Sequence, residues 1–206
     1  MRSRRSSQRS ITLLELTVSI VTVSIMIVTI YGIYTYSYSQ VLNSERRTKV
    51  QNELAYAFEH MSKYVQQANG DTSNPPIKAY PTVGTQTGFQ ARVDFNNPPT
   101  VSNLADDAWV GYYLTGNTLY AACTGTGCPF TTDTLSDKII ANFAVGIMPN
   151  NPTNGYYVNI DALGNLVEIG LVGRYKPTEA YSVATRTLNP QVEMKTKIVC
   201  NNASTH

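Results

Sequence analysis

The longest uncharged stretch of this chain runs from Leu16 to Ser44 and contains neither a basic nor an acidic side chain. It is about 29 residues long, and at a helical rise of about 1.5 Å per residue it exceeds the roughly 30 Å thickness of a bilayer core. A stretch of this length and composition predicts a membrane helix. One acid, Glu15, lies near the beginning of the apolar run that extends from Ser10 to Asn43.

The first ten residues, MRSRRSSQRS, contain four arginines and no acid. Positive charge directly before an apolar run favours retention of that end in the cytoplasm, with the other end exported. A cleavable secretory signal is the competing interpretation. It fits poorly, because the run is too long for the apolar region of a signal peptide, no A-x-A pattern follows it, and an acid lies inside it.

The rest of the chain has a polar composition with little charge. About 160 of the 206 residues lie beyond the apolar run, which is enough for one domain with a core of its own. Charged residues are 15% of the chain, against roughly 25% in ordinary soluble proteins, and Tyr is frequent. Four of the 16 basic residues belong to the leader, so 12 remain against 14 acidic residues, and no specific nucleic-acid partner is predicted.

Glu15 requires a physical explanation, because an acid at the centre of a membrane helix costs about 2.5–3.5 kcal/mol. One explanation places it near the cytoplasmic headgroups, where the cost is small. The other gives it a positive partner. A cut before Ile11 would create an α-amine that can meet Glu15 of the same chain or of a neighbour.

A basic leader, a small residue and then Ile-Thr-Leu-Leu-Glu at the head of an apolar helix resemble the class III leader of type IV pilins and pseudopilins. The resemblance implies that a prepilin peptidase cuts between Ser10 and Ile11 and methylates the new amine. It also implies that Glu15 is the family's fifth-residue glutamate, which acts in assembly. Ser10 and Ile11 stand where the family most often has Gly and Phe.

The helix is expected to continue beyond the apolar run as far as Asn69, giving about 59 residues and roughly 88 Å if unbroken. Favourable i, i+4 ion pairs are expected between Glu45 and Lys49 and between Glu59 and Lys63. In this second half, apolar residues recur at helical spacing and predict one buried stripe. The stripe consists of Val50, Leu54, Phe58, Met61, Val65 and Ala68.

After the helix, residues 70–108 are expected to be mostly loop, with one strand at Phe89–Phe95. Alternating patterns and turn residues then predict two hairpins and two further strands. These segments are 109–114 with 118–122, 156–160 with 166–175, 138–148, and 192–200. Five to seven mostly antiparallel strands after one long helix, apolar in its first half and amphipathic in its second, define an α+β class and, with the resemblance, the pilin fold.

Of the three cysteines, Cys123 and Cys128 are expected to form a disulfide across a short loop, which implies an oxidising compartment. A pair of free thiols is the alternative. Cys200 is left over, either as a free thiol or as a partner for another molecule. No second Cys pair or His cluster completes a metal site. Oxygen atoms of Asp161, Asn165 and Glu168 could hold Ca²⁺, but an ordinary Asp/Gly/Asn turn is the favoured explanation.

No catalytic motif is found around His60, His206 or any acid pair, so no enzymatic activity and no cofactor are predicted. The order of segments loosely resembles larger minor pilins and the J-type pseudopilin of type II secretion. That resemblance rests on Gln67-Ala68 at the end of the helix, a Tyr-rich "YYL…G…LY" hairpin and a late "VEIGLVGRY" strand.

The sequence therefore predicts a leader at 1–10, a membrane and filament-core helix at 11–43, an amphipathic half at 44–69 and a β-rich globular domain at 70–206. The expected function is that of a structural subunit of a type IV pilus-like filament. Expected partners are other pilin subunits, prepilin peptidase, an inner-membrane assembly platform and, before assembly, the membrane itself. The expected location is the inner membrane and then a periplasmic or extracellular filament. The alternatives are a signal-anchored periplasmic binding domain and a type II secretion pseudopilin.

Overall fold

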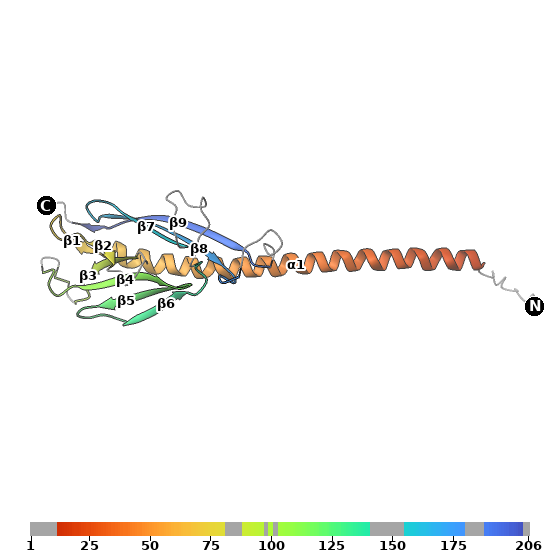
Figure 1. The fold of residues 1–206 in the computed structure, drawn as a ribbon, viewed down its shortest axis with the longest axis horizontal. Coiled ribbons are helices and arrows are strands. Elements are labelled where there is room, and N and C mark those ends of the chain that lie inside the picture. Colours follow the sequence, from red (N-terminus) through yellow and green to blue (C-terminus); the bar gives the residue numbers. More distant parts are fainter. Residues whose placement is uncertain are drawn as a thin grey trace, which may run out of the picture. The chain divides into compact units, whose positions relative to one another are not determined.

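The computed structural model describes residues 12–80, 88–96, 99–100, 103–140, 155–179 and 188–203. It divides into two compact units, with the boundary between Leu42 and Asn43. One helix, α1 (Leu13–Gln66), supplies the described helical part of the first unit and the central element of the second (Figure 1). The expected helix extended to Asn69. In the structure Ala68 donates to the carbonyl of Val65, which tightens the last turn, and the helix ends at Gln66.

The second unit contains ten strands among the described residues, more than the five to seven expected. Two of them have only two residues, and several of the others are short. They are β1 (Asn69–Gly70), β2 (Ile77–Tyr80), β3 (Gly88–Val93), β4 (Ala108–Thr115), β5 (Thr118–Thr124), β6 (Thr132–Ser136), β7 (Tyr156–Ile160), β8 (Leu166–Arg174), β9 (Gln191–Val199) and β10 (Asn202–Ala203).

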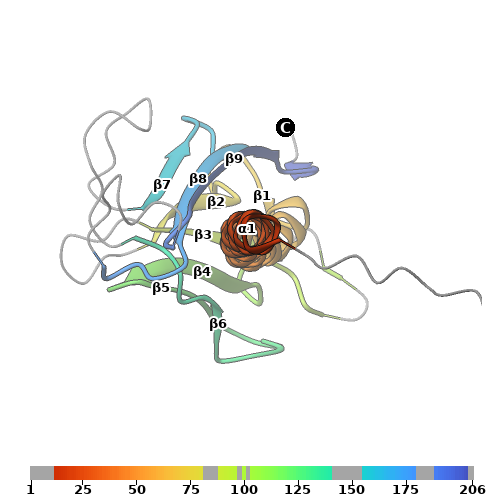
Figure 2. The same ribbon diagram turned by 90° about the vertical axis from the view of Figure 1, so that its right-hand side faces the viewer.

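Two antiparallel sheets contain most of these strands. The larger has the order β2-β3-β4-β5-β6 and the smaller the order β7-β8-β9, while β1 and β10 form a short parallel pair. The two antiparallel sheets flank the second half of α1 on different sides (Figure 2). A long helix packed on antiparallel sheets is the α+β arrangement predicted from the sequence, which is confirmed.

The core forms where the apolar stripe of α1 meets both sheets. The six residues of the predicted stripe are all buried, and Ala57 and Tyr64 extend it. On β8, Gly173 allows close approach of the helix, because a Cβ there would lie 2.9 Å from a methyl carbon of Val50 and 3.2 Å from one of Leu54. The stripe therefore packs against backbone at this strand, which explains why a glycine interrupts an otherwise apolar run.

The predicted hairpins are present. Gly116, with φ of 59°, and Asn117 connect β4 to β5, as the turn residues indicated. β7 and β8 pair across the turn that begins at Asp161. Of the strand expected at 138–148, Ile139 forms an isolated bridge with Gly173, and the part beyond Ile140 lies outside the described residues.

Two expectations for the segment after the helix and for the helix surface were wrong. β2 and the pair β1–β10 lie where the sequence indicated mostly loop or a helix end. The ion pairs expected for Glu45 with Lys49 and for Glu59 with Lys63 are not formed between these described residues. All four residues are exposed, where holding two long side chains together gains little, and the Lys63 ammonium instead lies 5.1 Å from the ring centroid of Tyr64.

Candidate functional site

Glu15 lies in the first turn of α1 and takes part in a capping box with Thr12. The Thr12 hydroxyl oxygen accepts a hydrogen bond from the Glu15 amide at 3.3 Å, and Glu15 Oε2 accepts one from the Thr12 amide at 3.5 Å. This reciprocal pattern satisfies two amides that have no partner within a helix. The sequence pattern Thr-x-x-Glu from Thr12 to Glu15 is the signature of this motif. Glu15 thus has a structural role independent of any second chain.

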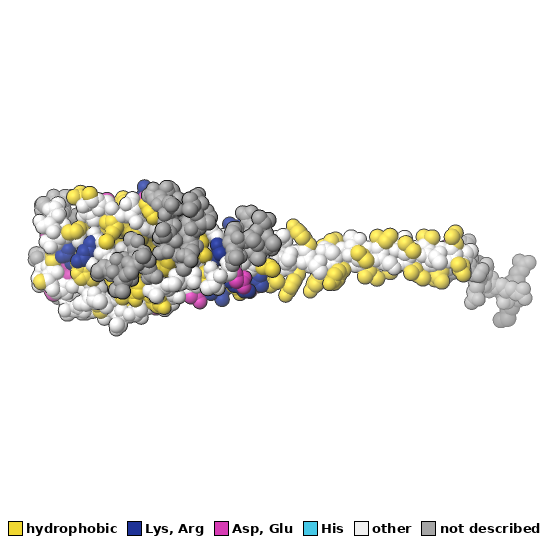
Figure 3. All heavy atoms as spheres, in the orientation of Figure 1, with side chains coloured by type: hydrophobic (Ala, Val, Ile, Leu, Met, Phe, Trp, Pro, Cys, Tyr) yellow, Lys and Arg dark blue, Asp and Glu magenta, His cyan; other side chains and the backbone are white. Residues whose placement is uncertain are grey.

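The first half of α1 presents an almost wholly apolar surface. Its large apolar side chains from Leu13 to Val41 are 53–81% exposed, and in Figure 3 they project along this half of the helix with uncharged polar groups and backbone between them. Among the described residues, α1 is the one helix long and apolar enough to cross a membrane. It can therefore serve as a membrane anchor.

Seven Ser and Thr hydroxyl groups in this half of α1 are satisfied inside the helix. Each donates to a backbone carbonyl three or four residues earlier, at 2.8–3.0 Å. The donors are Thr17, Ser19, Thr22, Ser24, Thr29, Thr35 and Ser39. Side chains that bond their own helix need no partner in a surrounding apolar medium. The surface that α1 offers to its surroundings is accordingly more apolar than its composition indicates.

The predicted processing position, between Ser10 and Ile11, lies outside the described residues. The tyrosines that precede the second unit, Tyr31, Tyr34, Tyr36 and Tyr38, are exposed, and the rings of Tyr34 and Tyr38 stack at 6.3 Å between centroids.

Cys123 and Cys128 form the predicted disulfide at the end of β5. Phe130, just beyond it, packs edge-on to His60 of α1 at 5.6 Å between ring centroids, and Tyr64 contacts the same phenyl ring. The bridge therefore fixes the loop that directly precedes Phe130, and Phe130 packs against the core. Cys200 is buried, and its thiol donates to the carbonyl of Ala68 at 2.8 Å.

His60 is half-buried between the helix and the larger sheet. Its Nδ1 lies 3.1 Å from the hydroxyl of Tyr112, which also donates to the His60 carbonyl. Burial lowers the pKa of His60 below its usual value, because the imidazolium form loses hydration there. The neutral ring is thus favoured, and its contacts are those of a packing residue.

The residues considered for calcium have other contacts. Asp161 Oδ1 accepts from the amide of Leu166 at 2.9 Å, as in an ordinary turn. Glu168 forms an ion pair with Lys195 across β8 and β9, and this contact lowers the pKa of Glu168. Within the described parts of the chain, no three His, Cys, Asp or Glu side chains are placed to hold a metal ion.

A buried charged cluster that the sequence did not indicate lies at one end of β3 and β4. Asp107 is 7% exposed, and neither carboxylate oxygen has a hydrogen-bond partner among the described residues. Burial, together with the neighbouring Asp94 carboxylate, raises the pKa of Asp107, while the nearby Arg92 guanidinium acts in the opposite direction. Arg92 is itself held by its bonds to the carbonyls of Asn74 and Pro75. Only the register of the two strands brings these side chains together.

The outer face of the larger sheet is aromatic. Tyr80, Tyr113 and Tyr120 form a stack with centroid separations of 5.3 and 5.6 Å. Beside them the indole of Trp109 has the Lys78 ammonium 3.9 Å from its ring centroid. These half-exposed rings stabilise the sheet across its strands and leave a tyrosine-rich surface.

No family model and no curated protein sequence matches this chain. Among solved structures, it is similar to a type IV-like pilin from Thermus thermophilus, with 14% sequence identity and a TM-score of 0.42. The match covers 76% of this chain and all of the Thermus chain. A similarity of this degree does not by itself establish a family.

Proposed function

We propose that this chain is a structural subunit of a type IV pilus-like filament. In this proposal a prepilin peptidase cuts it between Ser10 and Ile11, the first half of α1 holds it in the inner membrane, and the same helix later enters the filament core. The observation that supports the proposal is the combination of one acid in the first turn of α1 with an exposed apolar surface on which seven Ser and Thr hydroxyls are satisfied internally.

An apolar helix leaves lipid only for surroundings of similar polarity, because transfer to water would expose the whole surface from Leu13 to Val41. Neighbouring helices of the same kind provide such surroundings. Glu15 is then the one charge that must be accommodated. An ion pair with the terminal ammonium of a neighbour's Ile11 would offset the burial of both groups and set the register between subunits.

The capping box is compatible with the proposed cut. Thr12 becomes the second residue of the processed chain and keeps both groups that it uses with Glu15. The new ammonium at Ile11 is then one residue away from the cap. Glu15 can therefore cap the first turn of its own helix and also pair with the terminal ammonium of a neighbouring chain.

Mass spectrometry of the mature N-terminus tests this proposal. The expected product begins at Ile11 and carries one additional methyl group. Ser10→Leu should leave the chain uncut, because a small residue precedes the bond in the leaders that this one resembles, whereas the matched control Ser7→Leu should be processed normally. A wild-type chain that begins at Met1 or Arg2 would instead favour a permanently anchored extracytoplasmic domain.

Within the proposed class, the loose resemblance to larger minor pilins and J-type pseudopilins favours a minor subunit. The abundance of the chain in purified filaments distinguishes a minor subunit from a major one. A minor subunit is expected at far below the amount of the principal filament protein.

A further inference from the structure

Charged side chains follow directly after the uncharged segment, which ends at Ser44. Arg46, Arg47 and Lys49, which we call the cationic collar, lie within four residues of one another on α1, with Glu45 beside them. In the proposed orientation they are on the exported side. Cations are usually depleted close to a membrane helix on that side, so their presence requires a reason.

Arg46 is fixed in place by the end of the smaller sheet. Its Nη1 donates to the carbonyl of Leu188 at 2.7 Å, and its guanidinium lies 5.2 Å from the ring centroid of Tyr175. Arg46 thereby ties the helix to the segments that follow β8 and precede β9.

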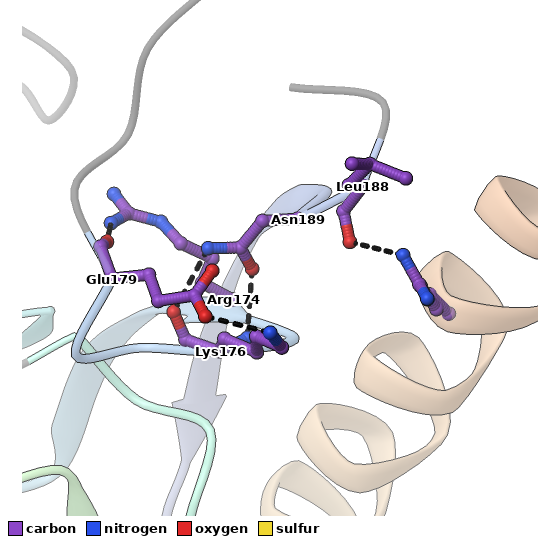
Figure 4. Close-up of polar contacts among 6 residues, drawn as sticks. Arg174, Lys176, Glu179, Leu188 and Asn189 are labelled. Carbon is purple, nitrogen blue, oxygen red and sulfur yellow. Dashed lines mark hydrogen bonds and ion pairs between the residues drawn. The ribbon is translucent and has the colours of Figure 1, made fainter. Parts of the chain in front are cut away.

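Those two segments are themselves held together. Asn189 is 1% exposed, its Oδ1 accepts from the Lys176 amide at 2.7 Å, and its Nδ2 donates to the Lys176 carbonyl at 2.9 Å. Arg174 donates a hydrogen bond to the side-chain oxygen of Gln191. It also donates to the carbonyl of Glu179, whose carboxylate pairs with Lys176 (Figure 4). The collar therefore adjoins a surface with fixed geometry.

Arg47 and Lys49 differ from these residues because their charges are not used within the unit. Both are exposed, and neither forms an ion pair with another described residue. Leu188, next to Arg46, is 56% exposed. Two available cations thus neighbour Arg46 in the sequence, whose partner Leu188 is exposed, and all follow directly after the uncharged segment, which is the combination expected of a surface that meets a lipid interface.

We propose that the cationic collar binds the headgroups of anionic phospholipids in the leaflet from which the globular unit emerges. The segment from Leu16 to Ser44 spans about 43 Å as a helix, which matches a bilayer of about 40–45 Å with its headgroup regions. Arg47 and Lys49 then reach the level of the phosphates. This inference rests on the membrane stage of the proposed function. It adds a lipid preference that filament assembly does not require.

The test uses the full chain in nanodiscs of equal amounts of phosphatidylglycerol and phosphatidylcholine, followed by native mass spectrometry of the lipids retained on the protein. We expect enrichment of phosphatidylglycerol. The double variant R47Q/K49Q should lower that preference by about 25-fold at low salt, since each cation near a membrane surface contributes about fivefold. Millimolar glycerol phosphate, a headgroup without acyl chains, should not displace the retained lipid.

The matched control is K63Q/K197Q, which removes the same charge from two exposed positions away from the collar. It should keep the preference of the wild-type chain. Equal enrichment in R47Q/K49Q and wild type overturns the proposal. A change in the number of protein copies per disc, without a change in the retained lipid, would also overturn the proposal, because the collar would then contact a second chain. Failure of the chain to enter nanodiscs would instead count against the proposed function, whereas entry without lipid preference counts only against the collar.

Discussion

Glu15 can be important for two different reasons, and two substitutions distinguish them. Glu15→Ala removes both the capping acceptor and the charge, whereas Glu15→Gln keeps a side chain that can cap at this position and removes only the charge. The two capping hydrogen bonds are 3.3 and 3.5 Å long and exposed. We therefore assign the cap about 0.5–1 kcal/mol, the lower part of the usual range.

An ion pair in a dry filament core has a much larger effect. Removal of one partner leaves the other charge buried and costs about 3–5 kcal/mol, which corresponds to roughly 100-fold or more in incorporation. If the proposed pairing is correct, Glu15→Gln and Glu15→Ala should both enter the membrane and both be nearly absent from filaments. If the cap alone matters, Glu15→Gln should assemble like the wild type.

The assay compares the chain in membrane and sheared-filament fractions by quantitative immunoblot, with equal expression of each variant. Thr12→Ala is the matched control, because it removes a capping hydroxyl without changing charge, and it should assemble almost normally. Normal filament levels of Glu15→Gln would refute the pairing mechanism, whatever the behaviour of Glu15→Ala.

The remaining predictions concern the second unit and are measured by thermal unfolding of the full chain in detergent. Gly173→Ala should lower Tm by roughly 2–12 °C through overpacking against the helix, whereas Gly32→Ala, which meets open space, should not lower Tm. The double substitution C123S/C128S should lower the free energy of unfolding by about 2 kcal/mol and loosen the packing of Phe130. Reductant should lower the stability of the wild type by the same amount. Because burial lowers the pKa of His60 in the folded chain, its contribution to stability is fully present above the unfolded-state pKa and decreases as pH falls below about 6.5. His60→Gln should reduce the difference in Tm between pH 7 and pH 5, and an unchanged difference would exclude this histidine as its source.

Patterns that depend on neighbouring residues were sufficient to predict much of the fold. The 3.6-residue repeat identified the buried stripe of α1, because one helix face needs only one apolar surface to pack against. The hairpin between β4 and β5 followed from Gly116-Asn117, since few residues accept the positive φ of such a turn.

Strands with weak local signals were missed. β2 is a four-residue edge strand between prolines, and its pairing with β3 is decided by the partner strand. β6 reads Thr-Asp-Thr-Leu-Ser, which does not alternate clearly, and it forms because β5 offers an unpaired edge. Intrinsic strand propensity could predict neither β2 nor β6, because the stability of both strands comes from long-range pairing.

The residues of the candidate site also fall into two groups, those that a local sequence pattern identifies and those that it does not. Glu15 and the cysteine pair stand out in the sequence because a lone acid in an apolar run and two closely spaced cysteines are local patterns. The capping box could also have been found from Thr-x-x-Glu. By contrast, the contact of Arg46 with Leu188 joins positions separated by 142 residues, and no local pattern indicates it.

The internal bonds of the α1 hydroxyls have a kinetic consequence. A polar group that faces outward would carry a water molecule or a protein partner with it, and any change of surroundings would first have to break that contact. Thr22 and Ser24, like the other five internally bonded Ser and Thr hydroxyls, keep the same acceptor in lipid and in a protein core. Passage of the helix from one medium to the other therefore needs no exchange of hydrogen bonds at these seven hydroxyls, so they are not expected to add to the activation barrier of that step, whereas the charge of Glu15 is.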